Sequence, residues 1–273
     1  MDLYTTIAAA FRLGWRVLDL DVHPIGYENI PDSGPAILAS NHVGYLDFCF
    51  VALAPPRPRR QVRFMARHDI FEKPVVGWAM RTMGQIPVDV HGDPASSLQI
   101  AEQRLRDGEI VGIHPESTIS PSFVPRTGRT GAVRLAQRSG APIVPVAIWG
   151  SQRLLTKWRP ERFTRHVAVM VRYGEPFTPG SDPVEATREL MERIGELLAK
   201  SQAAYPQRPS EEPGADWWVP AHLGGSAPTL EEAEARLARQ AEQRRRRAEE
   251  EGRRADGAPP TGEPRREEPP PGA

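Results

Sequence analysis

Short apolar runs alternate with longer amphipathic stretches along this chain, and this alternation constrains the fold more than any other feature. The expected strands are residues 36–39, 61–65, 85–88, 110–113, 143–148 and 166–173. The expected helices are residues 46–54, 73–83, 96–107, 131–139 and 184–202. Because parallel strands need a helical crossover between them, the pattern predicts an α/β fold with a mostly parallel central sheet flanked by helices. Functional sites in such folds form beyond the carboxyl ends of the strands.

A histidine and an aspartate, His42 and Asp47, follow the first of these expected strands. Residues five apart on a regular helix point about 140° away from each other, so the two side chains pair only if His42 lies in the turn before the helix. Gly44 gives that turn backbone freedom, and Asn41 can hydrogen-bond the turn backbone. In such a pair the carboxylate fixes the imidazole tautomer and leaves the other ring nitrogen free to take a proton from an alcohol. The spacing alone fits equally well a helix-entry histidine followed by an aspartate that the helix dipole favours.

Four blocks in this order resemble those of the glycerolipid acyltransferases, the family of lysophosphatidic acid (1-acyl-sn-glycerol-3-phosphate) acyltransferases. The blocks are residues 41–47, 84–90, 114–120 and 141–146. The first matches the family pattern NHxxxxD residue by residue, and the third resembles the pattern FPEGTRS. The resemblance covers roughly residues 20–205, and four ordered blocks are far more specific than one.

The resemblance implies a role for each site residue. It makes His42 the general base and Asp47 its orienting partner, while Glu116 would help to form the pocket for the glycerol phosphate. The residues that we expect to bind substrate are Asn41, Glu116, Ser117, Thr118, Arg67 and Arg129.

The chain departs from the family pattern at four positions. Val90 and Ile119 stand where the second and third blocks usually carry phosphate-binding arginines. Ser117 replaces a glycine, and His114 replaces an aromatic residue.

Two nearby arginines are candidates to replace the missing cations. Arg67 lies before the second block, and Arg129 precedes an expected helix start, where free backbone N–H groups favour anions. We hypothesise that Arg67 and Arg129 supply the phosphate contact. The alternative for each, and more so for Arg126, is a solvated surface arginine.

The expected reaction moves a fatty acyl group from acyl-CoA or acyl-carrier protein to the free hydroxyl of a lysophospholipid. The expected acceptor is 1-acylglycerol 3-phosphate, which would give phosphatidic acid. Because two arginines are missing, two alternatives stay open: another lysolipid or glycolipid acceptor, and a lipid-binding protein with a decayed site. The sequence has no HExxH, GxGxxG, P-loop or GxSxG pattern, so we expect no metal and no cofactor beyond the acyl carrier as co-substrate.

Composition indicates the compartment and the partners. Formal net charge is zero, so no global field favours nucleic acid, and the arginine run at residues 244–247 is offset by glutamates on both sides. The single cysteine, Cys49, suits a reducing compartment and is expected to be a buried apolar residue. We expect no secretory signal and no transmembrane helix. The expected location is therefore cytoplasmic, peripherally associated with the inner face of the cell membrane.

The chain divides into five expected parts. They are an amphipathic N-terminal helix (1–20), an acyltransferase domain (21–204), a linker with a tryptophan-rich island (205–228), a charged solvated helix (229–255) and a disordered tail (256–273). The first helix mixes aromatic and basic residues, so it is expected either to lie in a bilayer interface or to pack on the core. The tryptophan-rich island is expected either to dock back onto the domain or to touch lipid.

Overall fold

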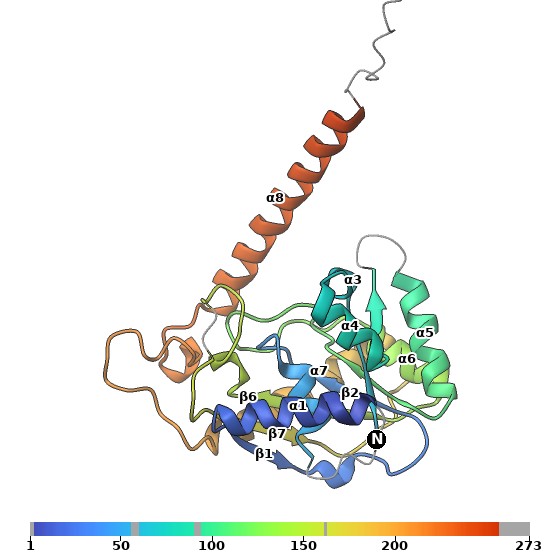
Figure 1. The fold of residues 1–273 in the computed structure, drawn as a ribbon, viewed down its shortest axis with the longest axis horizontal. Helices are drawn as coiled ribbons and strands as arrows, with labels where there is room; N and C mark the ends of the chain where they lie inside the picture. The colour runs from blue at the N-terminus through green and yellow to red at the C-terminus, as the bar shows by residue number, and fades with distance from the viewer. Residues whose placement is uncertain (1–2, 56–59, 90–93, 161–162, 257–273) are drawn as a thin grey trace, which may run out of the picture. The chain divides into compact units, whose positions relative to one another are not determined.

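The described part of the chain forms a seven-stranded sheet with the order β1-β7-β6-β2-β5-β3-β4 (Figure 1). The computed structural model describes residues 3–55, 60–89, 94–160 and 163–256. The strands are β1 (Asp21–Ile25), β2 (Ala36–Ser40), β3 (Val62–Arg67), β4 (Ile86–Val88), β5 (Ile110–Ile113), β6 (Ile143–Trp149) and β7 (Ala168–Tyr173). All neighbouring pairs are parallel except β6 and β7, which confirms the mostly parallel sheet.

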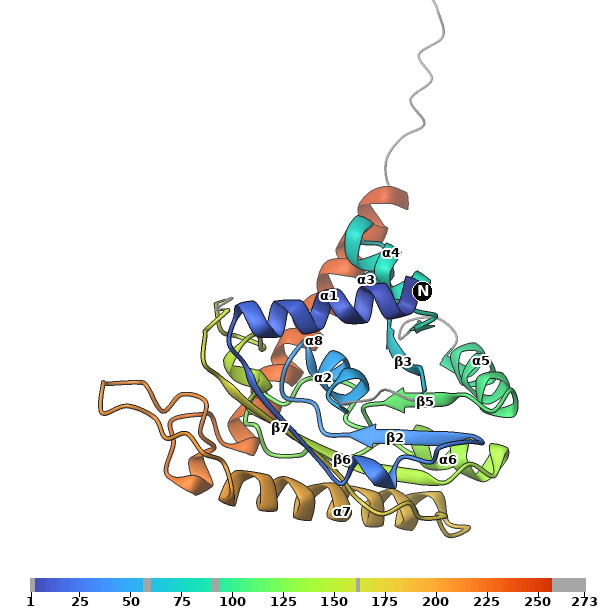
Figure 2. The same cartoon turned by 60° about the horizontal axis from the view of Figure 1, so that its bottom comes forward.

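Helices cover both faces of this sheet (Figure 2). The helices are α1 (Leu3–Val17), α2 (Asp47–Leu53), α3 (His68–Phe71), α4 (Pro74–Thr82), α5 (Pro94–Arg106), α6 (Gly131–Ser139), α7 (Pro183–Ala203) and α8 (Leu230–Asp256). Alternate residues of β2 face opposite layers: Ala36 and Leu38 pack with α1 and α2, whereas Ile37 and Ala39 pack with α5, α6 and α7. A strand buried on both faces reads as a continuous apolar run, which is why β2 was recognisable in the sequence.

The expected elements between residues 36 and 202 are all present, with ends within two residues of those expected. In the described residues, one further strand and one further α-helix were not expected. β1 has the sequence DVHPI, in which Asp21 and His23 are polar and Pro24 interrupts the strand, so it lacks a continuous apolar run. It pairs only with β7 at the edge of the sheet, where a proline is tolerated. The other element, α3, has only four residues.

The N-terminal helix α1 packs on the core through one face. Tyr4 and Ile7 are buried, and the ring of Trp15 stacks on that of Phe50 in α2, with centroids 4.8 Å apart. The guanidinium of Arg12 donates to the carbonyl oxygen of Leu53, at 2.9 Å from Nη2. Of the two arrangements expected for this helix, a bilayer interface or packing on the core, this face shows packing on the core.

The segment after α7 also packs against the sheet. Tyr205 and Trp218 are buried, and their rings contact each other and Trp149 at the end of β6. Residues 205–228 thus belong to the same compact unit as the sheet, which extends from Met1 to Leu230. This is the docked arrangement of the tryptophan-rich island.

The second unit, Glu231–Ala273, contains most of α8. Its charged side chains pair within the helix, as Glu242 does with Arg245 and Arg246. The expected tail beyond Asp256 lies outside the described residues.

Candidate active site

The candidate site is built on the turn between β2 and α2. Asn41 fixes this turn to β6: its amide donates to the carbonyl oxygen of Ile148 at 3.0 Å, and its Oδ1 accepts the N–H of Ile148 at 2.8 Å. The Asn41 side chain is buried, and both of its polar ends are used by this strand. Asn41 was expected to bind substrate. In the structure, its side chain anchors the turn to β6.

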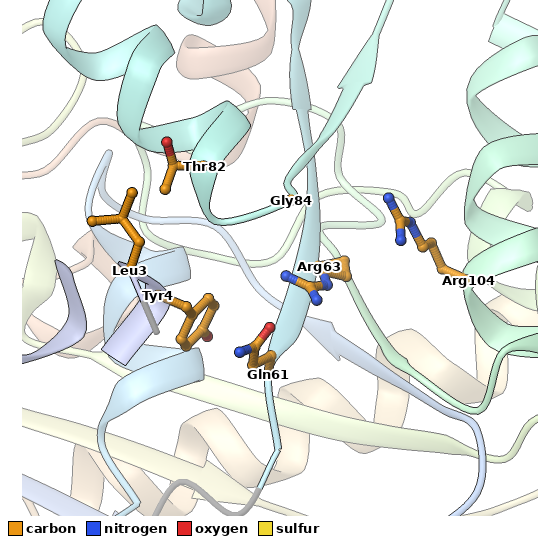
Figure 3. Close-up of a pocket in the computed structure, with 7 residues that line it drawn as sticks. All are labelled: Leu3, Tyr4, Gln61, Arg63, Thr82, Gly84 and Arg104. Carbon is orange, nitrogen blue, oxygen red and sulfur yellow. The ribbon is translucent and has the colours of Figure 1, made fainter. Parts of the chain in front are cut away.

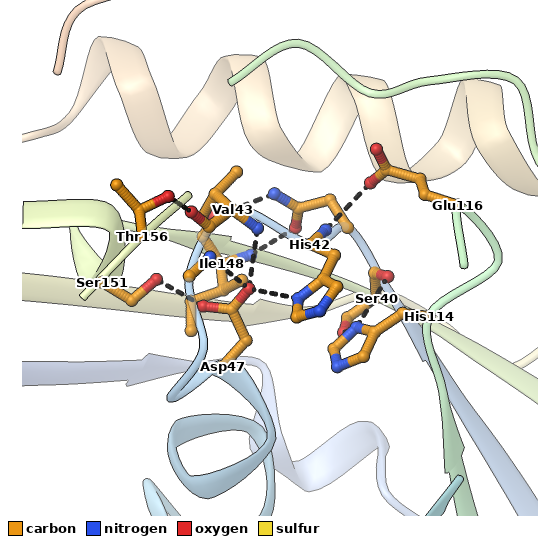
Figure 4. A network of polar contacts seen from close by, with 11 residues as sticks. Ser40, His42, Val43, Asp47, His114, Glu116, Ile148, Ser151 and Thr156 are labelled. Atoms are coloured by element: carbon orange, nitrogen blue, oxygen red, sulfur yellow. Dashed lines mark hydrogen bonds and ion pairs between the residues drawn. The ribbon is translucent and has the colours of Figure 1, made fainter. Parts of the chain in front are cut away.

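His42 lies in the turn and Asp47 is the first residue of α2, which is the one arrangement in which the two can pair. Nδ1 of His42 lies 2.9 Å from Oδ2 of Asp47 (Figure 4). Because a carboxylate oxygen accepts, this hydrogen bond places a proton on Nδ1 and leaves the lone pair of Nε2 free. The His42 side chain is 19% exposed and the Asp47 side chain is fully buried, so the ring is the part of the pair that solvent and substrate can reach.

Four donors converge on the Asp47 carboxylate. Besides His42, Oδ2 accepts the backbone N–H groups of Val43 at 2.7 Å and Gly44 at 2.9 Å. Oδ1 accepts the hydroxyl of Ser151 at 2.6 Å (Figure 4). A buried carboxylate is stable only when such donors replace water, so this network both holds the charge and fixes the direction of the carboxylate.

Ser151 is a site residue that the sequence did not reveal. It lies 104 residues from Asp47 in the chain, in the short helix that follows β6 (η2, Ser151–Arg153). The one indication in the sequence was that Ser151 closely follows an apolar strand. That strand is β6, and its carboxyl end lies beside that of β2, where sites form in such sheets.

Glu116 ties the turn to the loop that follows β5. Oε1 accepts the backbone N–H of His42 at 2.9 Å, and Oε2 accepts that of Arg126 at 3.0 Å. The side chain is buried, and burial raises its pKa to about 8, against the smaller lowering effect of these two N–H donors. Glu116, expected to line the phosphate pocket, therefore has both carboxyl oxygens occupied by the protein backbone.

This environment predicts a pH-dependent contribution of Glu116 to stability. Its folded pKa lies above the ordinary value of 4.5, so the folded state keeps a proton that the unfolded state has released. Raising the pH from about 5 to 8 should therefore lower the free energy of unfolding of the parent relative to Glu116→Gln, by at most about 1.4 kcal/mol per pH unit. Chemical denaturation of both proteins across this range measures the difference. The exposed Glu28→Gln variant is the control, and a flat difference for Glu116→Gln would contradict the assignment.

The remaining expected site residues lie around the same loops, with different surroundings. Ser117 is exposed and has a φ of 59°, in the left-handed region where the family pattern has glycine. Thr118 Oγ1 accepts from the ammonium of Lys157 at 2.7 Å. Arg67, at the end of β3, makes a two-pronged ion pair with Asp69.

Arg129 lies in the loop before α6. Its backbone N–H donates to the carbonyl oxygen of Pro115, next to Glu116, at 2.9 Å, and its side chain is exposed. Of the two positions that lack the expected arginine, Ile119 is buried in the core, and Val90 lies outside the described residues.

A pocket of about 300 Å³ lies near the opposite ends of the strands and is separate from this site. Leu3, Tyr4, Gln61, Arg63, Thr82, Gly84 and Arg104 line it (Figure 3). Gln61 directly precedes β3, whereas His42 follows the carboxyl end of the parallel strand β2. The two arginines of the pocket, Arg63 and Arg104, both pair with Glu109, at 2.8 and 3.7 Å.

Comparisons with known proteins agree with this geometry. Residues 21–149 match the Acyltransferase family model. The chain is 32% identical over 123 residues to the 1-acyl-sn-glycerol-3-phosphate acyltransferase of Bacillus subtilis, covering 45% of this chain and 60% of that protein. It is 30% identical over 178 residues to the chloroplastic 1-acyl-sn-glycerol-3-phosphate acyltransferase LPAT1 of Arabidopsis thaliana, covering 63% of this chain and 48% of that protein. The chain thus spans less than two thirds of the length of either relative.

The fold has a counterpart among solved structures. The crystal structure of the 1-acyl-sn-glycerophosphate acyltransferase PlsC from Thermotoga maritima superposes with a TM-score of 0.62 and 23% identity, over 75% of this chain and 82% of that one. At this identity the likeness concerns the fold, and the family assignment depends on the sequence matches. Together with the ordered sequence blocks, these matches show that residues 21–149 form an Acyltransferase-family region, similar to that of 1-acyl-sn-glycerol-3-phosphate acyltransferases.

Proposed function

We propose that the protein transfers a fatty acyl group from a thioester, acyl-CoA or acyl-carrier protein, to the free hydroxyl of a lysophospholipid. The observation that carries this proposal is the His42–Asp47 pair, in which one ring nitrogen is held by a buried carboxylate and the other is left to accept a proton. General base assistance of this kind contributes typically 10²–10⁴-fold to a rate.

The proposed reaction proceeds through one tetrahedral intermediate. Nε2 of His42 removes the proton of the lipid hydroxyl while its oxygen attacks the thioester carbonyl carbon, and Asp47 stabilises the resulting imidazolium. The carbon–sulfur bond then breaks, and the imidazolium returns its proton to the leaving thiolate. The products are an ester and a free thiol, so protons and electrons balance without a further reactant.

In the proposed reaction, groups outside the turn stabilise the oxyanion of the tetrahedral intermediate. The backbone N–H groups of residues 42–45 already donate to Glu116, Asp47 or the carbonyl oxygen of Leu155. Preorganised donors typically supply several kcal/mol to such a step.

The acceptor that we propose is 1-acylglycerol 3-phosphate, which would yield phosphatidic acid. Support comes from the similarity to the B. subtilis and A. thaliana relatives, which are named as 1-acyl-sn-glycerol-3-phosphate acyltransferases. A specific observation favours a second candidate, another lysolipid or a glycolipid: the expected phosphate ligand at position 119 is a buried isoleucine. The intact His42–Asp47 pair speaks against a merely lipid-binding protein with a decayed site.

An acceptor panel tests the proposal. The purified protein is given one acyl-CoA and, in separate reactions, lysophosphatidate, other lysophospholipids and a glycolipid acceptor, and both thiol release and the acylated product are measured. Transfer to lysophosphatidate with the highest kcat/KM supports the first candidate, and preference for another acceptor supports the second. Absence of transfer to every acceptor, with either carrier, would refute the proposed reaction.

Arg129 and Arg67 provide a matched pair of variants for the phosphate contact. Arg67 is already neutralised by Asp69, whereas the described residues hold no ion-pair partner for the exposed Arg129 guanidinium. We therefore expect Arg129→Ala to raise the KM for lysophosphatidate about tenfold or more, since hydrogen bonds to charged groups contribute about 1.5–3 kcal/mol, and Arg67→Ala to raise it less. An unchanged KM for Arg129→Ala would remove this residue from the phosphate site.

We also propose that the protein works at a membrane surface, where a lysophospholipid resides. In the described residues no helix has both the length and the apolarity to cross a bilayer. Val75, Val76 and Trp78 on α4 are nevertheless exposed, as are Leu13 and Val17 on the neighbouring α1. Exposed apolar side chains on adjacent helices support contact with the bilayer interface, which co-sedimentation with anionic phospholipid vesicles would check.

A further inference from the structure

Two imidazole rings lie flat against each other in the site. The centroids of His42 and His114 are 4.0 Å apart and their planes differ by 4° (Figure 4). His114 follows β5, the strand next to β2, so the two residues leave the same edge of the sheet side by side. Neither Asp47 nor Glu116 contacts the ring of His42 through its face, so this stacking is a separate restraint on that ring.

His114 is itself held in place. Its Nδ1 lies 3.0 Å from the hydroxyl oxygen of Ser40 and 3.3 Å from the carbonyl oxygen of the same residue. The ring of Phe64 on β3 packs on it with centroids 5.4 Å apart. Gly112 makes room for that ring, because a Cβ at this position would lie 2.6 Å from Phe64 ring atoms. Neighbouring strands thus fix the His114 ring before any substrate binds.

The His114 ring is neutral over the range in which acyl transfer would occur. Burial, and to a smaller extent the nearby His42, lower its pKa to about 3. A neutral aromatic face attracts a cation within about 6 Å of its centroid, with about 0.5–2 kcal/mol. The His42 ring becomes such a cation when it takes the proton of the lipid hydroxyl.

We propose that His114 is a positioning residue: its ring face holds the His42 imidazole in the orientation for proton transfer and favours the imidazolium that forms during the reaction. The hydrogen bond to Asp47 restrains the His42 ring at Nδ1 alone, so the ring could still rotate about that contact. Stacking against the face of His114 prevents this rotation. This inference rests on the proposed function, because it assigns His114 a part in the same reaction.

Two substitutions separate the effect of the ring face from that of volume. His114→Leu keeps an apolar side chain of similar size but has no π face, whereas His114→Phe keeps the face and gives up the contact with Ser40. We expect kcat to fall about tenfold in His114→Leu and to stay within about threefold of the parent in His114→Phe, with the acceptor KM unchanged in both. A loss in KM rather than kcat, or equal losses in both variants, would overturn the proposal.

A measurement without turnover distinguishes failure of this inference from failure of the proposed function. The ring protons of His42 are assigned by NMR from the signals that disappear in His42→Ala. Stacking should shift these signals upfield in the parent and in His114→Phe, and His114→Leu should lose the shift. If the parent transfers no acyl group, the proposed function fails, whereas the ring shifts report separately whether His114 holds the His42 ring. An absent shift in the parent would refute the positioning role even if acyl transfer occurs.

Discussion

Replacing His42 by alanine should lower kcat for acyl transfer by about 10²–10⁴-fold. The imidazole that the Asp47 carboxylate orients would be gone, and water in its place has neither the basicity nor the fixed position of the ring. The ring is partly exposed and Asp47 keeps its three other donors, so the variant should fold. Thiol release from acyl-CoA and formation of the acylated lipid, measured together, give the rate.

The chain contains a matched control for this variant. His166 Nδ1 lies 2.8 Å from Asp19 Oδ2, which is nearly the same contact as in the site, but both of these side chains are about two thirds exposed. His166→Ala removes a histidine–aspartate pair with no burial and no surrounding network, so kcat should stay at the parental value. If His42→Ala also retains the parental rate, the ring is not the base and the proposed mechanism is wrong.

Much of the fold could be predicted because its strands are buried on both faces. β2, β5 and β6 read as continuous apolar runs, and the helices between them have a clear amphipathic period. Edge strand β1 could not be recognised in this way, because an edge needs neither continuous burial nor a full ladder of N–H donors.

The site was predictable where local spacing decides the geometry. A turn with glycine between a strand and a helix allows residues 42 and 47 to meet, and the structure brings them to hydrogen-bonding distance. Contacts across the sheet were not predictable, because the register of β2 against β5 and β6 places Ser151 and His114 beside the pair. No pattern within the chain encodes that register.

Two of the expected substrate ligands have surroundings that residue type alone did not indicate. Asn41 and Glu116 are polar residues inside motif blocks, and both are expected there to face a substrate. In the structure their polar atoms are bonded to backbone groups of Ile148, His42 and Arg126. Buried polar side chains must find partners, and the backbone of a tight turn supplies many unsatisfied donors. The surroundings support a structural contribution of both residues to the position of His42.

Asp47 is the residue whose charge the proposed mechanism needs most, and an amide can test that charge without removing the side chain. In Asp47→Asn the amide oxygen can accept the N–H groups of Val43, Gly44 and His42, which now converge on Oδ2. The amide nitrogen would then face the hydroxyl of Ser151, which can accept as well as donate. The hydrogen-bond pattern therefore survives, and the negative charge does not.

Asp47→Asn should accordingly lower kcat at least about 10²-fold while changing the free energy of unfolding by no more than about 2 kcal/mol. The imidazolium of His42 would then form beside a neutral amide in place of the carboxylate that contacts its Nδ1. Ser151→Ala is the matched variant: it removes one hydrogen bond from the same carboxylate but keeps the charge, so its kcat should fall less than about tenfold. Steady-state kinetics and denaturant unfolding of both variants give the comparison. If the two variants lost kcat equally, Asp47 would act only by orienting the His42 ring, because Asp47→Asn removes the negative charge and Ser151→Ala keeps it.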